Sequence, residues 1–196
     1  MVRPRAENYE ERQLEILDTA AAMFAERGFD GTPMSAIATG CGVSKALLYH
    51  YFESKEELLY QMLKSHCQLL IETASKAVAI DGDDQARLES LVQELMALYM
   101  GSRDKHVVLM NNLKALSPEQ QKEIKTLERQ IVSTIKSLIG KLQPALSEPE
   151  RTAMAMYLMG AINWTYTWFK PKGAISSADY ATMAATMFIE GLKKVR

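Results

Sequence analysis

Three side chains that can donate hydrogen bonds to an anion, Lys45, Tyr49 and His50, lie within six residues of one another. The surrounding stretch, residues 31–52, contains no Asp or Glu, although charged residues make up 24% of the chain. A polyanion would therefore not be repelled here. A lysine at a helix start can reach a guanine edge or a phosphate, whereas tyrosine and histidine donate to phosphates. These residues predict a contact surface for duplex DNA.

The flanking residues predict a short helix that turns these donors outward. Ser44 is expected to cap the helix, and the apolar Leu48 and Phe52, four residues apart, point to the interior with Ile37 and Ala38. The side chains left facing outward are those of Lys45, Ala46, Leu47, Tyr49 and His50. The methyl groups of the alanine and the leucine can meet a thymine methyl group.

Another short helix is predicted immediately before this one. Thr32 followed by Pro33 combines a capping oxygen with a preset backbone angle, which favours a helix start. Gly40 and Gly42 tolerate the left-handed backbone that ends one helix and turns into the next. Two short helices joined by a glycine turn indicate a helix-turn-helix, whose second helix enters the major groove of DNA.

The stretch contains the run Ile37-Ala38-x-x-x-Gly42-Val43-Ser44-x-x-x-Leu48-Tyr49-x-Tyr51-Phe52-x-Ser54-Lys55-x-x-Leu58. This run closely resembles the DNA-binding domain of TetR/AcrR-family transcriptional regulators. The resemblance implies DNA contacts at Thr32, Lys45, Ala46, Leu47, Tyr49, His50 and Lys55. Leu47 departs from the pattern because many members carry a polar residue such as Thr there, which bears on base preference.

Composition places limits on the class of protein. The 196 residues are 47% hydrophobic, enough for one large or two small domains. The net charge of -1 and the ten acidic against seven basic residues in positions 1–64 require any DNA contact to come from a local patch. Cys41 and Cys67 have no short-spaced partner, and no apolar run is long enough to span a membrane. A cytoplasmic protein without disulfides or structural zinc is expected.

The rest of the chain is predicted to be all helical, with about nine helices in total. Asn8 and Glu11 are expected to cap a first helix that ends at Gly28, and residues 1–8 form either a DNA-reaching arm with Arg3 and Arg5 or a disordered start. Further helices are predicted over residues 54–80, 85–100 and 118–141, from the Ser147 cap to 169, and from a cap at Ser176 or Ser177 to 194. Between the second and third of these, a shorter segment contains Val107, Val108, Leu109, Met110 and Leu113. The predicted domains are 1–53, the arm and DNA-binding domain, and 54–196, the ligand-binding and dimerisation domain.

The last two helices carry more apolar surface than one core needs. Residues 154–169 are apolar around more than half of the helix circumference, and the final helix is similarly rich. A twofold homodimer would cover the surplus, and the TetR resemblance implies the same pairing. The predicted interface consists of Met154, Leu158, Ile162, Tyr180, Met183, Met187 and Phe188. Two recognition helices about one DNA turn apart predict a palindromic operator.

Methionine and aromatic side chains can line either an ordinary core or an adaptable apolar cavity. The TetR resemblance implies a cavity for a small-molecule effector, and the candidates are Met62, Met96, Tyr99, Met100, Met110, Asn163, Trp164 and Trp168. The run Asn163-Trp164-Thr165-Tyr166-x-Trp168-Phe169 resembles a branch whose members respond to acyl-coenzyme A thioesters in fatty-acid or aromatic-acid catabolism. Cations for the phosphates of such an effector would be Lys114, Arg151, Lys170 and Lys172.

The sequence thus predicts a ligand-responsive transcriptional repressor, released from its operator by an acyl thioester or, in a multidrug-efflux repressor, by lipophilic or cationic drugs. A helical adaptor without DNA binding is the alternative of another class. No nucleophile elbow, phosphate-cradling loop or His-x-x-x-His pair indicates an enzyme or a cofactor. His66 and His106 are interpreted as solvated or hydrogen-bonded, with an effector or metal ligand as the alternative. Cys41 is interpreted as a core residue or a redox-sensing thiol.

Overall fold

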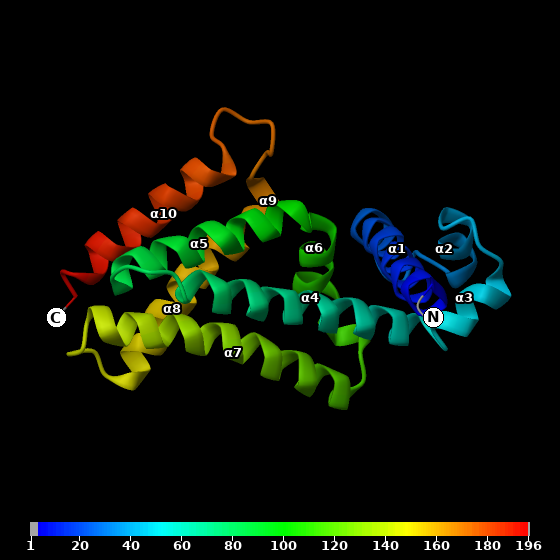
Figure 1. Ribbon diagram of the computed structural model, residues 1–196, viewed down its shortest axis with the longest axis horizontal. Helices are drawn as coiled ribbons and strands as arrows, with labels where there is room; N and C mark the ends of the chain where they lie inside the picture. The colour runs from blue at the N-terminus through cyan, green and yellow to red at the C-terminus, as the bar shows by residue number, and fades with distance from the viewer. Residues whose placement is uncertain (1–3, 196) are drawn as a thin grey trace. The chain divides into compact units, whose positions relative to one another are not determined.

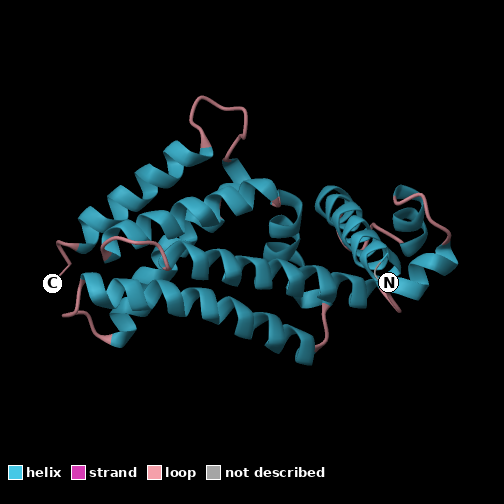
Figure 2. Ribbon diagram, in the orientation of Figure 1, coloured by secondary structure: helices cyan, strands magenta, loops and turns pink. Residues whose placement is uncertain are grey.

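The computed structural model describes residues 4–195, with the side chains of residues 9–195. Within this range every regular element is a helix (Figures 1 and 2), so the predicted all-α class is confirmed. The helices are α1 (Pro4–Arg27), α2 (Met34–Gly40), α3 (Lys45–Tyr51), α4 (Lys55–Val78), α5 (Asp84–Gly101), α6 (Arg103–Asn112), a 3-10 turn η1 (Leu113–Ala115), α7 (Pro118–Leu142), α8 (Glu148–Asn163), α9 (Thr165–Trp168) and α10 (Ser177–Leu192). None of the described helices is long and apolar enough to cross a membrane.

Two compact units make up the described chain. The first contains α1, α2, α3, the start of α4, α6 and the start of α7, up to His66 and over Asp104–Glu123. The second contains Cys67–Arg103 and the residues from Ile124 onward. In the first unit α2 packs against both α1 and α3 (Figure 1), and in the second α10 packs along α5 and contacts α8.

Serine side chains cap several helix starts, and the predicted caps at Ser44 and Ser147 are confirmed. The hydroxyls of Ser44 and Ser54 accept the backbone N–H groups three residues on, at 3.1 and 3.0 Å. Ser117 and Gln120 exchange two hydrogen bonds at the start of α7, and Ser147 forms a full capping box with Glu150. These caps satisfy amide groups that the first helical turn leaves without partners.

Three predicted helix boundaries are wrong. α1 begins at Pro4, before the predicted cap at Asn8, because a proline fits the first helical turn. Arg3 and the side chain of Arg5, which the predicted arm needs, lie outside the described residues. Thr32 does not cap α2. The single helix expected up to Phe169 is interrupted at Trp164, where the Thr165 hydroxyl donates to the Ile162 carbonyl at 2.6 Å and competes with the helical pattern.

Candidate DNA-binding site

Helix α3 presents one face to solvent and the other to the core of the first unit. Leu48 is 0% exposed and Phe52 1%, whereas Leu47 is 40% and Tyr49 43% exposed. Lys45, Ala46 and His50 are exposed as well. The side chains predicted to face outward therefore do so, and no acidic residue lies on this helix or in the turn before it.

The turn between α2 and α3 depends on one glycine. Gly42 adopts φ +64°, a left-handed conformation that other residues reach at a cost. The N–H of Val43 then donates to the Ala38 carbonyl at 3.0 Å, which closes the end of α2. Burial raises the pKa of the neighbouring Cys41 thiol, so the thiol stays protonated at neutral pH and the redox-sensing alternative loses support.

Aromatic rings support the outward donors. The Lys45 ammonium lies 5.8 Å from the centroid of the Tyr49 ring, a cation–π distance. At the far end of α3, Tyr9 of α1 stacks on Tyr51 at 4.5 Å and meets the edge of His50 at 6.4 Å. Tyr9 could not be identified from the sequence, because nothing in local spacing indicates which part of α1 reaches the end of α3.

Two of the residues implied to contact DNA differ from the rest. Thr32 is 0% exposed, and its hydroxyl donates to the Gly28 carbonyl at 2.8 Å, so this hydroxyl is not presented to DNA. Lys55 is half-buried, and its ammonium donates to the Phe29 carbonyl at 2.8 Å while lying 4.2 Å from the Phe29 ring. Both side chains instead fix the loop between α1 and α2.

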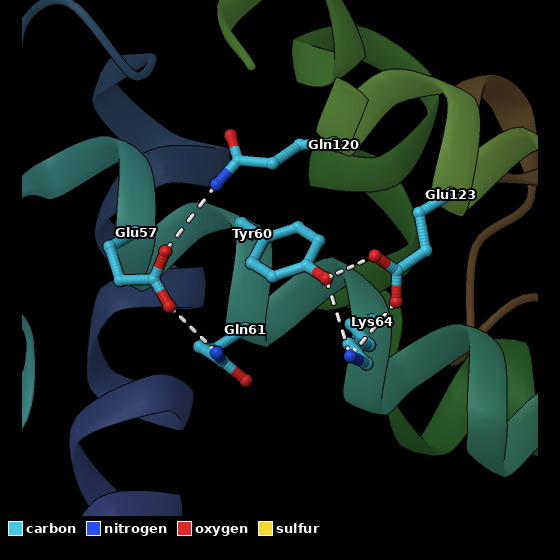
Figure 3. Close-up of polar contacts among 6 residues, drawn as sticks. All are labelled: Glu57, Tyr60, Gln61, Lys64, Gln120 and Glu123. Carbon is cyan, nitrogen blue, oxygen red and sulfur yellow. Dashed lines mark hydrogen bonds and ion pairs between the residues drawn. The ribbon is translucent and has the colours of Figure 1, made fainter. Parts of the chain in front are cut away.

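A polar cluster joins α4 to the start of α7 inside the first unit (Figure 3). The Tyr60 hydroxyl donates to Glu123 at 2.6 Å, and the Lys64 ammonium lies 2.9 Å from the same carboxylate. These hydrogen bonds hold the pKa of Glu123 below its usual range. Glu57 accepts from Gln61 at 2.7 Å and from Gln120 at 3.4 Å, one hydrogen bond to each of its two carboxylate oxygens. The cluster fixes α7 to the helix that follows α3.

The candidate effector residues fall into two groups. Met62, Met96 and Tyr99 are fully buried, and Met100, Met110 and Asn163 are half-buried. Trp164 and Trp168, by contrast, are 62% and 52% exposed, so the structure does not place them inside a cavity. The interruption at Trp164 changes the helical phase and turns both indoles outward, with the buried Thr165 between them. Met62 and Met110 belong to the first unit and the other candidates to the second.

The four cations predicted to bind effector phosphates also fall into two groups. Arg151 donates to the carbonyls of Leu146 at 2.8 Å and Pro144 at 3.0 Å, so its guanidinium holds the loop between α7 and α8. Lys114, Lys170 and Lys172 are exposed. Arg151 is thus a structural residue in this conformation, and the three lysines keep the predicted role as a proposal.

The predicted dimer residues are partly core residues of the second unit. Leu158, Ile162 and Phe188 are 1%, 0% and 6% exposed, so they offer little surface for contact with a partner copy. Met183 and Met187 are 50% and 71% exposed, and Met154 and Tyr180 are half-buried. The exposed apolar residues of α8 are instead Met156 and Tyr157, at 56% and 66%. The exposed Tyr157 of α8 stacks on the buried Phe188 of α10 at 6.3 Å.

His66 of α4 and His106 of α6 form a buried pair in the first unit. They are 1% and 2% exposed, and their ring centroids lie 5.9 Å apart in an edge-to-face arrangement. Neither imidazole nitrogen of His66 has a hydrogen-bond partner, which contradicts the prediction of a solvated or hydrogen-bonded role. Burial, followed by the nearby His106 and Lys105, lowers the pKa of His66 from 6.5 to about 3.

An outward-facing capped helix, reached by a glycine turn from a second short helix, defines a helix-turn-helix DNA-binding protein. The chain belongs to the TetR family of bacterial regulatory proteins. Residues 16–62 match the model described as "Bacterial regulatory proteins, tetR family", and residues 81–192 match "Tetracyclin repressor-like, C-terminal domain".

Similar proteins are transcriptional regulators. The HTH-type transcriptional repressor KstR2 of Rhodococcus jostii (strain RHA1) is 25% identical over 92% of this chain and 91% of its own length. A TetR-family transcriptional regulator from Bordetella parapertussis 12822 is 33% identical, with a TM-score of 0.86 over 94% of this chain and 97% of that one. AibR, solved in complex with isovaleryl coenzyme A and operator DNA, is 28% identical, with a TM-score of 0.80 over 90% and 97%.

Proposed function

We propose that this protein is a homodimeric, ligand-responsive transcriptional repressor that binds a palindromic operator. The observation that carries the proposal is the outward face of α3, where lysine, tyrosine and histidine donors stand free of any acidic neighbour on the helix. The name of the similar protein KstR2 supports repression as the direction of control.

Different residues of α3 contact the bases and the phosphates of the operator. Lys45, at the first position of the helix, reaches a guanine edge, while Ala46 and Leu47 meet thymine methyl groups in the major groove. Tyr49 and His50 donate to phosphates and fix the register of the helix. Lys55 contributes with the donors that its contact with Phe29 leaves free, since an ammonium has three. Thr32 is left out of this set because of its burial.

The domain assignment follows from this division. Residues 1–53 act as the DNA-binding domain, and residues 54–196 act as the domain for effector binding and dimerisation. The exposed apolar faces of α8 and α10 pair with their copies across a twofold axis, through Met156, Tyr157, Met183 and Met187. Two copies then present two α3 helices to successive major grooves on one side of the duplex.

We propose an acyl-coenzyme A thioester as the effector. The support is the similar protein AibR, whose structure contains isovaleryl coenzyme A and operator DNA. An effector can release the operator only if it binds the DNA-incompetent arrangement more tightly than the DNA-bound one. Its binding would displace α4, which carries both the junction after α3 and the buried His66.

The test is a titration of the full-length protein against the DNA upstream of its own gene, at two salt concentrations and with a scrambled fragment as control. Nanomolar binding that weakens steeply with salt and prefers the upstream fragment is the expected result. Addition of acyl-coenzyme A thioesters, free acids or cationic drugs then identifies the class that releases the DNA. Equal affinity for both fragments would contradict operator recognition, and release by cationic drugs alone would replace the thioester with a drug effector.

A further inference from the structure

The interior of the first unit contains a polar side chain, that of His66, for which the fold provides no hydrogen-bond partner. His66 is 1% exposed, and neither of its ring nitrogens has a hydrogen-bond partner. A neutral imidazole carries one N–H donor and one lone pair, and buried polar groups of this kind are nearly always hydrogen-bonded. His66 therefore keeps an unused donor and an unused acceptor in a site shielded from water.

His66 has an apolar neighbour on its own helix, α4, and a polar neighbour on α6. Met62, one turn earlier on α4, is 0% exposed, and His106 on α6 places its ring 5.9 Å away. Met110, one turn after His106, is half-buried. Methionine side chains are flexible and repack around irregular guests. A ligand between α4 and α6 would thus meet imidazoles at its polar end and thioethers along its apolar part.

We propose that His66 and His106 form the polar anchor of the effector site, and that an imidazole N–H of His66 donates to the carbonyl oxygen of an acyl group. The proposal rests on the proposed function, since it names the residues and the ligand chemistry of the effector site.

Charge in this part of the first unit selects against a cationic ligand. Among the described residues, burial, His106 and Lys105 are what lower the pKa of His66. The Lys105 ammonium forms an ion pair with the carboxylate of Asp18 at 2.5 Å, so this carboxylate is already paired. A buried cation needs a carboxylate or a π face to replace its water. An acyl oxygen needs only an N–H donor, which His66 has.

The position of the pair also connects the ligand to DNA binding. His106 follows Lys105 on α6, and the Lys105–Asp18 ion pair joins α6 to α1, the helix on which the helix-turn-helix packs. A ligand that moves the His106 ring would therefore also act on this ion pair.

The test is calorimetric titration of the free full-length protein with octanoyl-coenzyme A, octanoate and tetraphenylphosphonium, using wild type, His66→Phe and His66→Gln. The phenylalanine fills the space without a donor, and the glutamine keeps an N–H. We expect octanoyl-coenzyme A or octanoate to bind wild type, His66→Phe to bind at least ten-fold more weakly, about 1.4 kcal/mol, and His66→Gln to stay within about three-fold. Binding of the thioester but not the acid would identify the uncharged carbonyl.

Equal affinity of wild type and His66→Phe, binding of tetraphenylphosphonium alone, or binding of none of the three probes would each overturn the proposal. A second measurement uses the wild-type protein alone, so the proposal can be tested even if His66→Phe does not fold. The chain has three histidines, so in spectra of protein with ¹⁵N-labelled histidine the acyl probe should shift two imidazole signals and leave that of His50 in place. Ligand binding is measured without DNA, so a failure of operator recognition remains a separate result.

Discussion

Aromatic rings lie against two of the three donors on α3, and these contacts limit what each donor can contribute to DNA recognition. The Lys45 ammonium lies over the Tyr49 ring at 5.8 Å, a contact worth about 0.5–1 kcal/mol at an exposed position. Tyr49 is 43% exposed, so its hydroxyl can be approached by a phosphate. His50 lies against Tyr9, which adds a brace from α1 to the end of the helix. The proposed function accordingly assigns base reading and phosphate contact to different residues of one short helix.

Substitutions of Lys45 and Tyr49 should accordingly have different signatures. Tyr49→Ala should weaken binding to all DNA sequences about alike, because a phosphate contact carries no base information. Lys45→Ala should weaken binding and also relax the preference at one base pair, by about 1–3 kcal/mol of discrimination. Affinities for a panel of operators with single base changes measure both effects.

Lys76→Ala is the matched control, since it removes one positive charge from α4 outside the recognition helix. Indistinguishable base preference before and after Lys45→Ala would contradict its base-reading role.

Acid should destabilise the protein through His66. Its pKa is 6.5 when unfolded and about 3 when folded, so between these values the unfolded chain binds the extra proton. The contribution of His66 to the free energy of unfolding is therefore complete above pH 6.5. It decreases as the pH falls toward 3, by about 1.4 kcal/mol per pH unit. Urea unfolding at a series of pH values should show a shallower decline for His66→Phe than for wild type. Parallel curves for the two proteins would rule out a buried neutral imidazole.

At the scale of helices, local chemistry made most starts and ends predictable. Ser44 caps the helix that the sequence assigned to it, and Ser147 begins its predicted helix with a capping box, because a serine just before a helix can accept from a backbone N–H that has no partner in the first turn. Thr32 has the same chemistry, yet its hydroxyl donates backwards to the end of α1. Only the path of the loop from Gly28 decides between these partners, and the local sequence does not encode that path.

Facing directions were less predictable where a helix is apolar on every side. In α3, one buried leucine among exposed neighbours gives a clear phase. In α8, Leu158 and Met156 are equally apolar, and only packing against α5 and α10 buries the first and exposes the second. The predicted interface therefore included the core residues Ile162 and Phe188 and missed Met156 and Tyr157. His66 was misjudged for a related reason, since its burial depends on contacts with α6.

The turn between α2 and α3 can be tested through its glycine. Gly42→Ala places a side chain at φ +64°, which costs about 1–2 kcal/mol although no atom lies within 4 Å of the new Cβ. Gly101→Ala is the control: the site, the last residue of α5, is also open but has no positive φ, so the alanine should stabilise by about 0.5–1 kcal/mol. Urea unfolding measures both changes. A neutral Gly42→Ala variant with unchanged operator affinity would show that the left-handed turn is dispensable.

For the whole molecule, a net charge of -1 should make DNA binding by a single copy weak. A symmetric dimer can compensate for this low charge. Two copies on one operator double the number of α3 contacts, and the second contact is intramolecular once the first is made. Under the proposed function, operator affinity should therefore depend on the pairing of the exposed apolar faces more than that of a basic monomeric DNA-binding protein would. This dependence would tie operator affinity to the outer surface of α8 and α10.

That dependence predicts the outcome of charging the proposed interface. Met183 and Met187 lie one turn apart and are 50% and 71% exposed, so the double substitution Met183→Glu with Met187→Glu should leave the fold of one copy intact. Four carboxylates brought together at a twofold interface would repel and remain unpaired, which should shift the protein to monomers at micromolar concentration. Operator affinity should fall by at least 100-fold, and half-site affinity should stay the same.

Sedimentation velocity gives the oligomeric state of the double variant, and titration of full and half operators gives the affinities. Leu69→Glu is the matched control, because it charges an apolar residue of α4 that is 43% exposed and lies on neither of the last two helices. A double variant that still sediments as a dimer would place the interface on another surface. A monomeric variant that still binds the full operator tightly would instead contradict the argument that pairing supplies the affinity that net charge does not.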